Sequence, residues 1–150
     1  MDEIKIKVKR LSDEFADISL PVYATHGSAG LDIAAAVKEE IIIPRGKIGL
    51  VPTNFSVEIP EGYEIQIRPR SGLALKHGIT VLNSPGTIDS DYRGEVKIIL
   101  INLGEEDYKI SRGERIAQLV VSKAYQAKFT EVEDLNDSHR GEGGFGHSGK

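Results

Sequence analysis

The chain has 150 residues, 39% of them hydrophobic, which is enough for one domain with a single core but includes no apolar run long enough to span a membrane. Its formal net charge of −4 excludes the broad basic surface that long nucleic acids require, although a small anion could still bind a local basic cluster. The absence of cysteine excludes disulfides and thiolate metal sites, and it fits a reducing compartment such as the cytoplasm.

Short apolar runs separated by turn signals recur along the chain. The first, at residues 4–8, alternates Ile and Val with Lys, as a first strand does and a signal peptide does not. Further strands are predicted at residues 31–37, 40–44, 47–52, 55–59, 63–67, 96–101 and 115–121. Most of these runs alternate apolar and polar residues, and no long amphipathic helix is predicted. The pattern therefore predicts an all-β protein, built as a sandwich or a barrel.

One short helix is predicted at residues 71–78. Ser71 is a good N-cap, and Gly78 can adopt the left-handed conformation that ends a helix. Arg68 and Arg70 lie just before the helix start, where free N–H groups and the positive end of the dipole favour a phosphate-like anion. A surface helix with solvated arginines is the alternative.

Residues 80–95 join two β-prone runs and predict a wide hairpin with an accessible tip. The tip carries the amide of Asn83, the carboxylates of Asp89 and Asp91, and the ring of Tyr92. The backbone angles of a turn require only residues such as Gly, Asn or Asp, and they do not require a large aromatic ring beside two carboxylates. The tip is therefore a candidate functional site. The alternative is a pair of solvated turn acids and a tyrosine packed on its own strand.

Two weaker signals lie on either side of this hairpin. Asp32 follows a glycine-rich turn at the mouth of an apolar strand, and Gln118 is an uncharged polar residue in another strand. Either could be turn chemistry alone.

The C-terminal stretch at residues 138–150 is too rich in glycine to hold regular structure. It could be a disordered linker. However, Arg140 and Phe145 among the glycines suit a mobile flap, in which the guanidinium forks a phosphate and the ring stacks on a base. We therefore expect a single domain with a β-core at 1–137 and a flap at 138–150.

Taken together, these stretches resemble the five ordered motifs of the trimeric dUTP diphosphatase (dUTPase) family. The motifs run in family order and cover nearly the whole chain from residue 29 onward. The segments that carry the resemblance are AGLD at 29–32, RPRSGLA at 68–74, GTIDSDYRG at 86–94, RGERIAQ at 112–118 and RGEGGFG at 140–146.

The resemblance implies a jelly-roll-like β-sandwich or barrel with one short helix, and a homotrimer with sites shared between subunits. It also implies hydrolysis of dUTP to dUMP and pyrophosphate with Mg²⁺, which would keep uracil out of DNA and supply dUMP for dTMP synthesis. Because Mg²⁺ prefers phosphate oxygens and water, no metal cage of protein side chains is expected. The four histidines are scattered and are expected to be solvated.

The resemblance also implies a role for each matching residue. Asp89 would be the general base that activates a water for in-line attack on the α-phosphorus. Tyr92 would lie against the deoxyribose and leave no room for a 2′-hydroxyl, and Asp32 would be a supporting acid that orders the site. The residues expected to bind substrate are Arg70, Ser71, Gly72, Asn83, Gly86, Thr87, Ile88, Tyr92, Gln118, Arg140, Phe145 and Gly146.

Within this set, the resemblance divides the substrate among the motifs. The hairpin around Asn83 would read uracil, and the helix start with Gln118 would hold the phosphate chain. Arg140 would clamp the γ-phosphate, and Phe145 would cap the base. One departure concerns the tail: the family usually places hydroxyl residues after Gly146, whereas here His147 precedes Ser148. The phosphate contacts of the last turn are therefore in doubt.

Three other functions fit parts of the sequence. The related dCTP deaminases have a catalytic glutamate in the strand after the hairpin, where this chain has Ile99, which cannot transfer a proton. A catalytically silent nucleotide-binding trimer would not need Asp89 or the tail. A jelly-roll carbohydrate-binding or capsid module would explain the strands but not the arginine, tyrosine and tail pattern.

Overall fold

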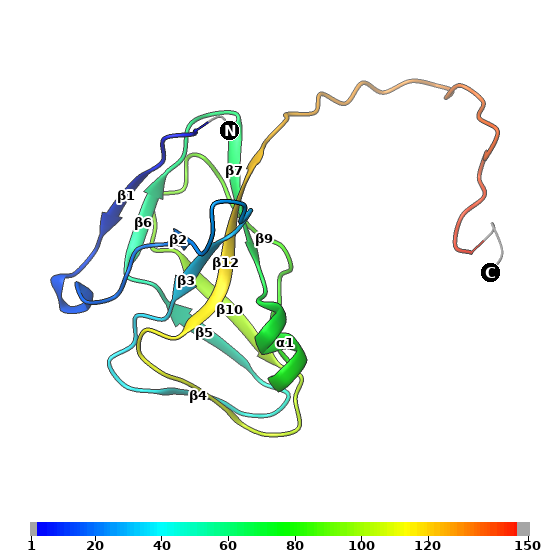
Figure 1. Cartoon of the computed structure of the whole chain (residues 1–150). Helices are drawn as coiled ribbons and strands as arrows, with labels where there is room; N and C mark the ends of the chain where they lie inside the picture. The colour runs from blue at the N-terminus through cyan, green and yellow to red at the C-terminus, as the bar shows by residue number, and fades with distance from the viewer. Residues whose placement is uncertain (1–2, 147–150) are drawn as a thin grey trace.

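The computed structural model describes residues 3–146, which fold almost entirely as strands (Figure 1). The single α-helix of this part of the chain, α1, spans Ser71–His77, and a 3-10 turn spans Asp13–Phe15. The strands are β1 (Lys7–Arg10), β2 (Val22–Tyr23), β3 (Leu31–Ala34), β4 (Ile41–Ile43), β5 (Ile48–Pro52), β6 (Phe55–Glu58), β7 (Tyr63–Arg68), β8 (Ile79–Val81), β9 (Gly86–Ile88), β10 (Lys97–Asn102), β11 (Tyr108–Ile110) and β12 (Arg115–Lys123). The all-β prediction is confirmed.

The strands pair antiparallel in four groups. The largest is a five-stranded sheet in the order β2-β3-β12-β7-β9, and a second sheet has the order β5-β10-β8. Two further pairs are β1 with β6 and β11 with β4. Because strands far apart in sequence, such as β3 and β12, lie side by side, the chain crosses between sheets in the manner of a jelly-roll-like fold.

The core lies between the sheets and is made of aliphatic side chains from both halves of the chain. In β10, Ile98 and Leu100 are buried while Lys97 is exposed, which is the alternation expected of a strand with one face on the core. The buried amide of Asn102 donates to the carbonyls of Ile43 and Glu106. This buried polar group is therefore satisfied, and it ties the end of β4 and the loop after β10 to the end of β10.

Arg112 packs the N-terminal segment against the turn before β12. Its guanidinium lies 4.6 Å from the centre of the Phe15 ring and 2.6 Å from an Asp17 carboxylate oxygen. This contact holds the pKa of Asp17 below its usual value of 3.8. Arg112 begins the fourth motif of the sequence, but its observed contacts are structural.

The predicted strands are observed with shifts at their ends, and the first moves from residues 4–8 to Lys7–Arg10. The sequence does not predict β2, β9 or β11, because each has only two or three residues and cannot display an alternating pattern. The predicted hairpin is confirmed by the pairing of β8 with β10.

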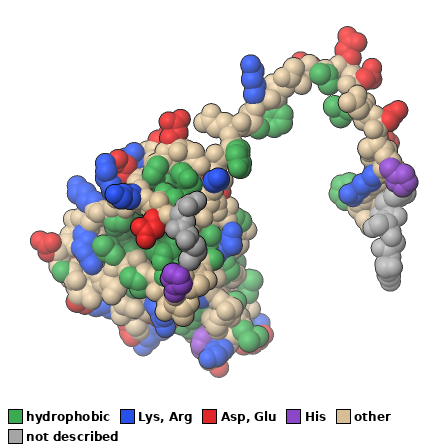
Figure 2. Space-filling view, turned by 45° about the horizontal axis from the view of Figure 1, so that its top comes forward, with side chains coloured by type: hydrophobic (Ala, Val, Ile, Leu, Met, Phe, Trp, Pro, Cys, Tyr) green, Lys and Arg blue, Asp and Glu red, His purple; other side chains and the backbone are tan. Residues whose placement is uncertain are grey.

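The C-terminal region leaves the β-core and stands away from it (Figures 1 and 2). The last strand ends at Lys123, and residues 124–137, expected to belong to the β-core, contain no helix or strand. After Ala124, which donates to the Gly62 carbonyl, no backbone hydrogen bond in the described chain joins this region to a strand. Of the predicted flap, residues 147–150, including His147 and Ser148, lie outside the described residues.

Candidate functional site

One row of the large sheet brings three sequence motifs together. Gln118 in β12 lies directly opposite Asp32 in β3 on one side and Arg68 in β7 on the other. Antiparallel register thus places residues from the first, second and fourth motifs on neighbouring strands.

A bulge in β12 adds a fourth member to this row. The register with β3 shifts between Arg115 and Ala117. Residues three apart in a regular strand point to opposite faces, but the extra residue lets Arg115 and Gln118 reach the same carboxylate. Arg115 donates from Nη1 to Asp32 Oδ2 at 2.9 Å, and Gln118 donates from Nε2 to Asp32 Oδ1 at 3.3 Å. Arg115 belongs to the fourth motif, but its contact with Asp32 could not be predicted, because the bulge leaves no signal in the sequence.

Arg70 joins the same group from the start of α1. Its Nε lies 3.5 Å from Asp32 Oδ1, and its Nη1 donates to the Arg115 carbonyl at 2.9 Å. The Asp32 side chain is only 8% exposed, whereas that of Arg70 is 27% exposed. We call Asp32, Arg70, Arg115 and Gln118 the Asp32 cluster. A nearly buried carboxylate here orients three side chains that keep donors at the surface.

The start of α1 differs from the prediction in one respect. Ser71 is the first helical residue, so the N-cap is Arg70, in extended backbone and with no capping side-chain hydrogen bond. Ser71 and Gly72 are exposed beside the Asp32 cluster, so their backbone N–H groups remain available to a ligand. Gly78 ends the helix with φ of 66°, as predicted.

The hairpin between β8 and β10 is anchored on two sheets. Its first half contains β9, which pairs with β7 through Ile88 opposite Ile65 and Thr87 opposite Gln66. Gly86 is buried, and a Cβ there would lie 3.1 Å from Ile67 Cβ and 3.2 Å from Asn83 Nδ2. A side chain at position 86 would therefore push the Asn83 amide or the Ile67 side chain away by a few tenths of an ångström.

Six predicted site residues line one cavity of about 370 Å³ at this hairpin, which we call the hairpin pocket. The rest of its lining consists of apolar side chains, among them Leu50, Ile67 and Ile99, and of two charged residues, Glu95 and Lys97. The six residues are Asn83, Gly86, Thr87, Ile88, Asp89 and Tyr92. The pocket thus combines an amide, a carboxylate and an aromatic ring with an apolar wall, a typical composition of a small-molecule site.

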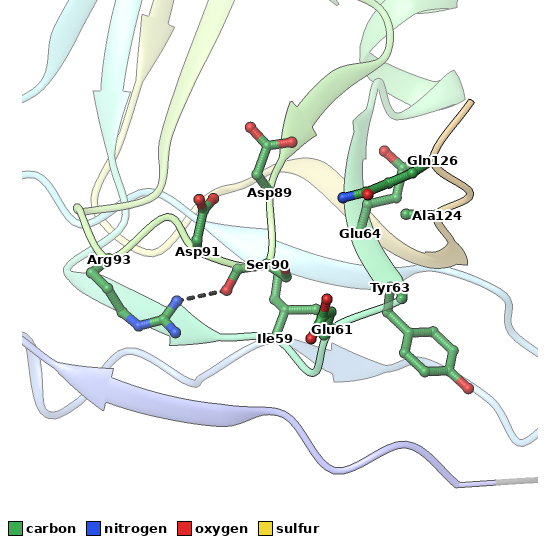
Figure 3. A pocket seen from close by; sticks show the side chains of 11 residues that line it. Ile59, Glu61, Tyr63, Glu64, Asp89, Ser90, Asp91, Arg93, Ala124 and Gln126 are labelled. Atoms are coloured by element: carbon green, nitrogen blue, oxygen red, sulfur yellow. Dashed lines mark hydrogen bonds between the residues drawn. The ribbon is translucent and has the colours of Figure 1, made fainter. Parts of the chain in front are cut away.

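Asp89 lines both this pocket and a second, larger hollow of about 770 Å³, which Figure 3 shows. The acids Glu61, Glu64 and Asp91 also line that hollow. The Asp89 carboxylate is exposed and points away from the contact between Arg93 and Ser90 in Figure 3. No hydrogen bond or ion pair within residues 3–146 engages it, so it is open to water and to a ligand.

The tip of the hairpin is closed by its own contacts. Arg93 Nη1 donates to the carbonyls of Ser90 at 2.7 Å and Tyr92 at 3.0 Å. The Tyr92 N–H donates to the Asp89 carbonyl at 3.2 Å, and the Tyr92 hydroxyl donates to the Glu95 carbonyl at 2.9 Å. The backbone that carries Asp89 and Tyr92 is therefore held in place before any ligand arrives.

A third hollow, of about 460 Å³, lies beside the start of the hairpin. Gln118 and Arg68 line it together with Ser84 and Pro85. Of the Asp32 cluster, Gln118 therefore faces the start of the hairpin within one chain.

The tail residues lie apart from both groups. Arg140 Nε donates to the Gly143 carbonyl at 2.5 Å, and the Phe145 side chain is fully exposed. Among residues 3–146, the hydrogen bonds made by residues 138–146 all stay within the tail. The structure therefore does not bring Arg140, Phe145 or Gly146 to the pocket of their own chain.

Two other properties concern metals and membranes. No group of three His, Cys, Asp or Glu side chains in the described part of the chain could hold a metal ion. Likewise, no helix within residues 3–146 has the length and apolar character needed to cross a bilayer.

Comparison with known proteins identifies the family. The dUTPase family model matches residues 16–149. A deoxyuridine 5′-triphosphate nucleotidohydrolase of Fusobacterium nucleatum is 56% identical over 146 residues, covering 97% of this chain and 99% of that protein. The dUTPase of Staphylococcus bacteriophage 80alpha, solved with dUPNHPP, has a TM-score of 0.86 at 29% identity and covers 97% of this chain and 99% of its own.

A mutant dUTPase from phage phi11 of S. aureus, described with a structural Mg(II) ion, has a TM-score of 0.76 at 24% identity. The match covers 87% of this chain and 98% of the phage chain, and it shows the shared fold. With the family model over most of its length and a curated relative at more than half identity, this chain belongs to the dUTPase family.

Proposed function

We propose that this chain hydrolyses dUTP to dUMP and pyrophosphate, with uracil and deoxyribose in the hairpin pocket. The observation that carries the proposal is the gathering of six residues of one hairpin around a single cavity, in a chain of the dUTPase family. The name of the Fusobacterium relative and the dUTP analogue in the phage 80alpha structure support this substrate. A cavity of about 370 Å³ is within the usual range for small-molecule sites.

The hairpin pocket supplies the groups that distinguish uracil. The Asn83 amide offers both a donor and an acceptor to the edge of the base, as do the backbone groups near it. Ile67 and Ile99 supply apolar walls for the ring. Because β9 is tied to β7, the hairpin cannot easily widen to admit the methyl group of thymine. Ile99 also lacks the ionisable group that deamination would need.

Tyr92 is the proposed wall for the sugar. Its ring lines the hairpin pocket beside Asp89 and is held through its hydroxyl. A ribose 2′-hydroxyl placed against this ring would lose its hydrogen bonds to water, at a cost of about 1–3 kcal/mol, apart from any steric clash.

Asp89 is the proposed general base. Its exposed carboxylate lies at the mouth of the pocket and has no partner among the described residues, so it can accept a proton from a water aimed at the α-phosphorus. General-base assistance contributes about 10²–10⁴-fold to a rate. The remaining acceleration comes from holding water and phosphorus in line and from neutralising phosphate charge.

The proposed phosphate site is the Asp32 cluster with the exposed start of α1. Arg70 and Gln118 would contact the phosphate chain together with Ser71 and Gly72, while Asp32 acts by orienting the first two. Mg²⁺ would neutralise part of the phosphate charge. The residues present fit an ion held by substrate oxygens and water, because the Asp32 carboxylate is already engaged by arginine and glutamine donors.

The tail is proposed to complete the site of another copy in a homotrimer. In support, Arg140 and Phe145 make no hydrogen bond to the β-core, and the segment before them exposes Tyr125, Phe129 and Leu135 by 86–94%. Large apolar side chains exposed in a row are typical of a surface that a partner covers. Arg140 would then clamp the γ-phosphate and Phe145 would stack on uracil, with Gly146 allowing the turn.

The proposed homotrimer can be tested by light scattering coupled to gel filtration, which should give the mass of three chains.

In the cell, removal of dUTP would keep uracil out of DNA, and the dUMP produced would feed dTMP synthesis. We propose that this takes place in the cytoplasm, which is consistent with a chain that has no cysteine.

The decisive experiment is incubation of the protein with Mg²⁺ and each of dUTP, UTP, dTTP and dCTP, followed by assays for pyrophosphate and ammonia. We expect pyrophosphate from dUTP at a rate far above that from the other three. Absence of pyrophosphate with dUTP would contradict the proposal, and ammonia from dCTP would indicate a deaminase instead.

A further inference from the structure

The ring of Tyr92 lies directly over Gly94. A Cβ placed on Gly94 would come within 2.4 Å of the Tyr92 hydroxyl oxygen, 2.6 Å of Cζ and 2.9 Å of Cε2. Carbon atoms do not approach this closely, so any side chain at position 94 would displace the ring from its observed place. The ring position therefore depends on a residue that does not itself line the hairpin pocket.

The reason for a glycine at position 94 is the limited space next to the Tyr92 ring, rather than the backbone conformation of this residue. Unlike Gly78 or Gly113, Gly94 does not have a positive φ in the left-handed region. Alanine could therefore adopt the backbone of Gly94 without strain. A substitution to alanine tests the steric contact with the ring and little else.

Two hydrogen bonds define the place of the ring above Gly94. The Tyr92 hydroxyl donates to the carbonyl of Glu95, the residue after the glycine, at 2.9 Å. At the other end, Arg93 holds the Tyr92 carbonyl at 3.0 Å, so the backbone has little freedom to follow a displaced ring. A methyl group at position 94 would break the hydroxyl contact and move the ring relative to Asp89 and the hairpin pocket.

We propose that Gly94 is a positioning residue that sets the selectivity of the site for deoxyribose over ribose. By leaving room for the ring, it fixes Tyr92 at the distance that admits a 2′-hydrogen and rejects a 2′-hydroxyl. The inference rests on the proposed function, since it concerns the sugar of the same nucleotide. An apolar site that meets a substrate analogue with a hydroxyl discriminates against it by about 10²-fold in other enzymes.

The test compares kcat/KM for dUTP with kcat/KM for UTP in wild type, Gly94→Ala and Gly27→Ala. Gly27 is the matched control, because a Cβ there would meet nothing within 4 Å and its φ is not in the left-handed region. We expect the dUTP-to-UTP ratio to fall about tenfold in Gly94→Ala and to stay unchanged in Gly27→Ala. An unchanged ratio in a folded Gly94→Ala protein would overturn the inference.

Tyr92→Ala provides a second, independent criterion. If Gly94 acts through the ring, Gly94→Ala should change the ratio no further once the ring is gone. An additive effect in the double variant would mean that position 94 acts by another route, and the proposal would fail.

If the Gly94→Ala variant does not fold, as judged by circular dichroism, the Tyr92→Phe variant provides the test instead. It keeps the ring but removes its hydrogen bond to Glu95, so the ratio should fall by about threefold, and an unchanged ratio would overturn the inference. Wild-type protein that fails to hydrolyse dUTP would contradict the proposed function itself, a different outcome from hydrolysis with unaltered selectivity in the variants.

Discussion

The hairpin tip and the C-terminal tail are both polar, glycine-containing segments that carry proposed site residues, yet they are held very differently. The tip is anchored by β9 and closed by hydrogen bonds from Tyr92 and Arg93. The tail makes hydrogen bonds only within itself among the described residues, and Phe145 is fully exposed. One segment is preorganised, whereas the other lacks contacts that could fix it.

This difference corresponds to a difference between the chemical tasks that we propose for the two segments. A base that must aim a water at phosphorus works only when its position is fixed in advance, because misplacement by about 1 Å can cost about 10²-fold in rate. A clamp and a stacking ring must admit the substrate before they contact it, so they benefit from mobility. The variants below change one region at a time.

The largest effect is expected for Asp89→Asn. The amide keeps the shape of the side chain but cannot accept a proton from water, so turnover should fall by about 10²–10⁴-fold. Binding of dUTP with Mg²⁺, measured by calorimetry, should remain close to wild type. The control is Asp91→Asn, a neighbouring acid that lines the second hollow but not the hairpin pocket. Comparable turnover in Asp89→Asn would remove Asp89 from the mechanism.

The next largest effect should come from deleting residues 138–150. The truncated protein should fold and melt as the full chain does, because residues 138–146 contribute no hydrogen bond to the β-core. Hydrolysis of dUTP should slow by about 10²-fold, since charged donors are lost at the phosphates and water is no longer excluded. Full activity in the truncated protein would show that the tail has no part in the site.

A smaller effect is expected for Phe145→Ala. If the ring stacks on uracil, its loss should weaken substrate binding by about 1–3 kcal/mol, seen mainly as a higher KM. Phe145→Trp should retain the stacking and serve as the control. Equal KM values for the alanine and tryptophan variants would argue against a stacking role.

The smallest effect is expected at Arg112, which lies outside both regions. Arg112→Gln should lower the melting temperature at pH 7 by no more than about 4 °C and leave turnover unchanged. The pKa of Asp17 is lowered in the folded protein, so the contribution of this ion pair is present above the usual value of 3.8 and is lost as the pH falls through the folded pKa. The difference between wild type and variant should therefore shrink below about pH 4. A difference that persists there would point to the Phe15 contact instead.

Much of this architecture could be predicted because it depends on local patterns. Alternation in β7 and β10 indicates strands with one buried face, and Gly78 marks the end of α1. The unusual chemistry of the hairpin tip marks the pocket that Asn83 and Tyr92 line together.

The features that the sequence does not predict depend on contacts between residues far apart in the chain or on steric detail. The contact of Arg115 with Asp32 requires a bulge, and the role of Gly94 requires the ring above it. The helix begins at Ser71 itself, so the N-cap is Arg70, which makes no capping side-chain hydrogen bond. The tail shows no preferred partner in one chain, since its apolar side chains are exposed.

The bulge in β12 also has a consequence for how this protein can vary. A deletion within a strand usually moves the following side chains to the opposite face, but the stretch from Arg115 to Gln118 has one residue more than the strand opposite it. Loss of that extra residue would restore a regular strand in which the arginine and the glutamine are two positions apart and share a face, so both would still face Asp32. In this part of the sheet, a single-codon deletion should therefore be less damaging than a deletion elsewhere in β12.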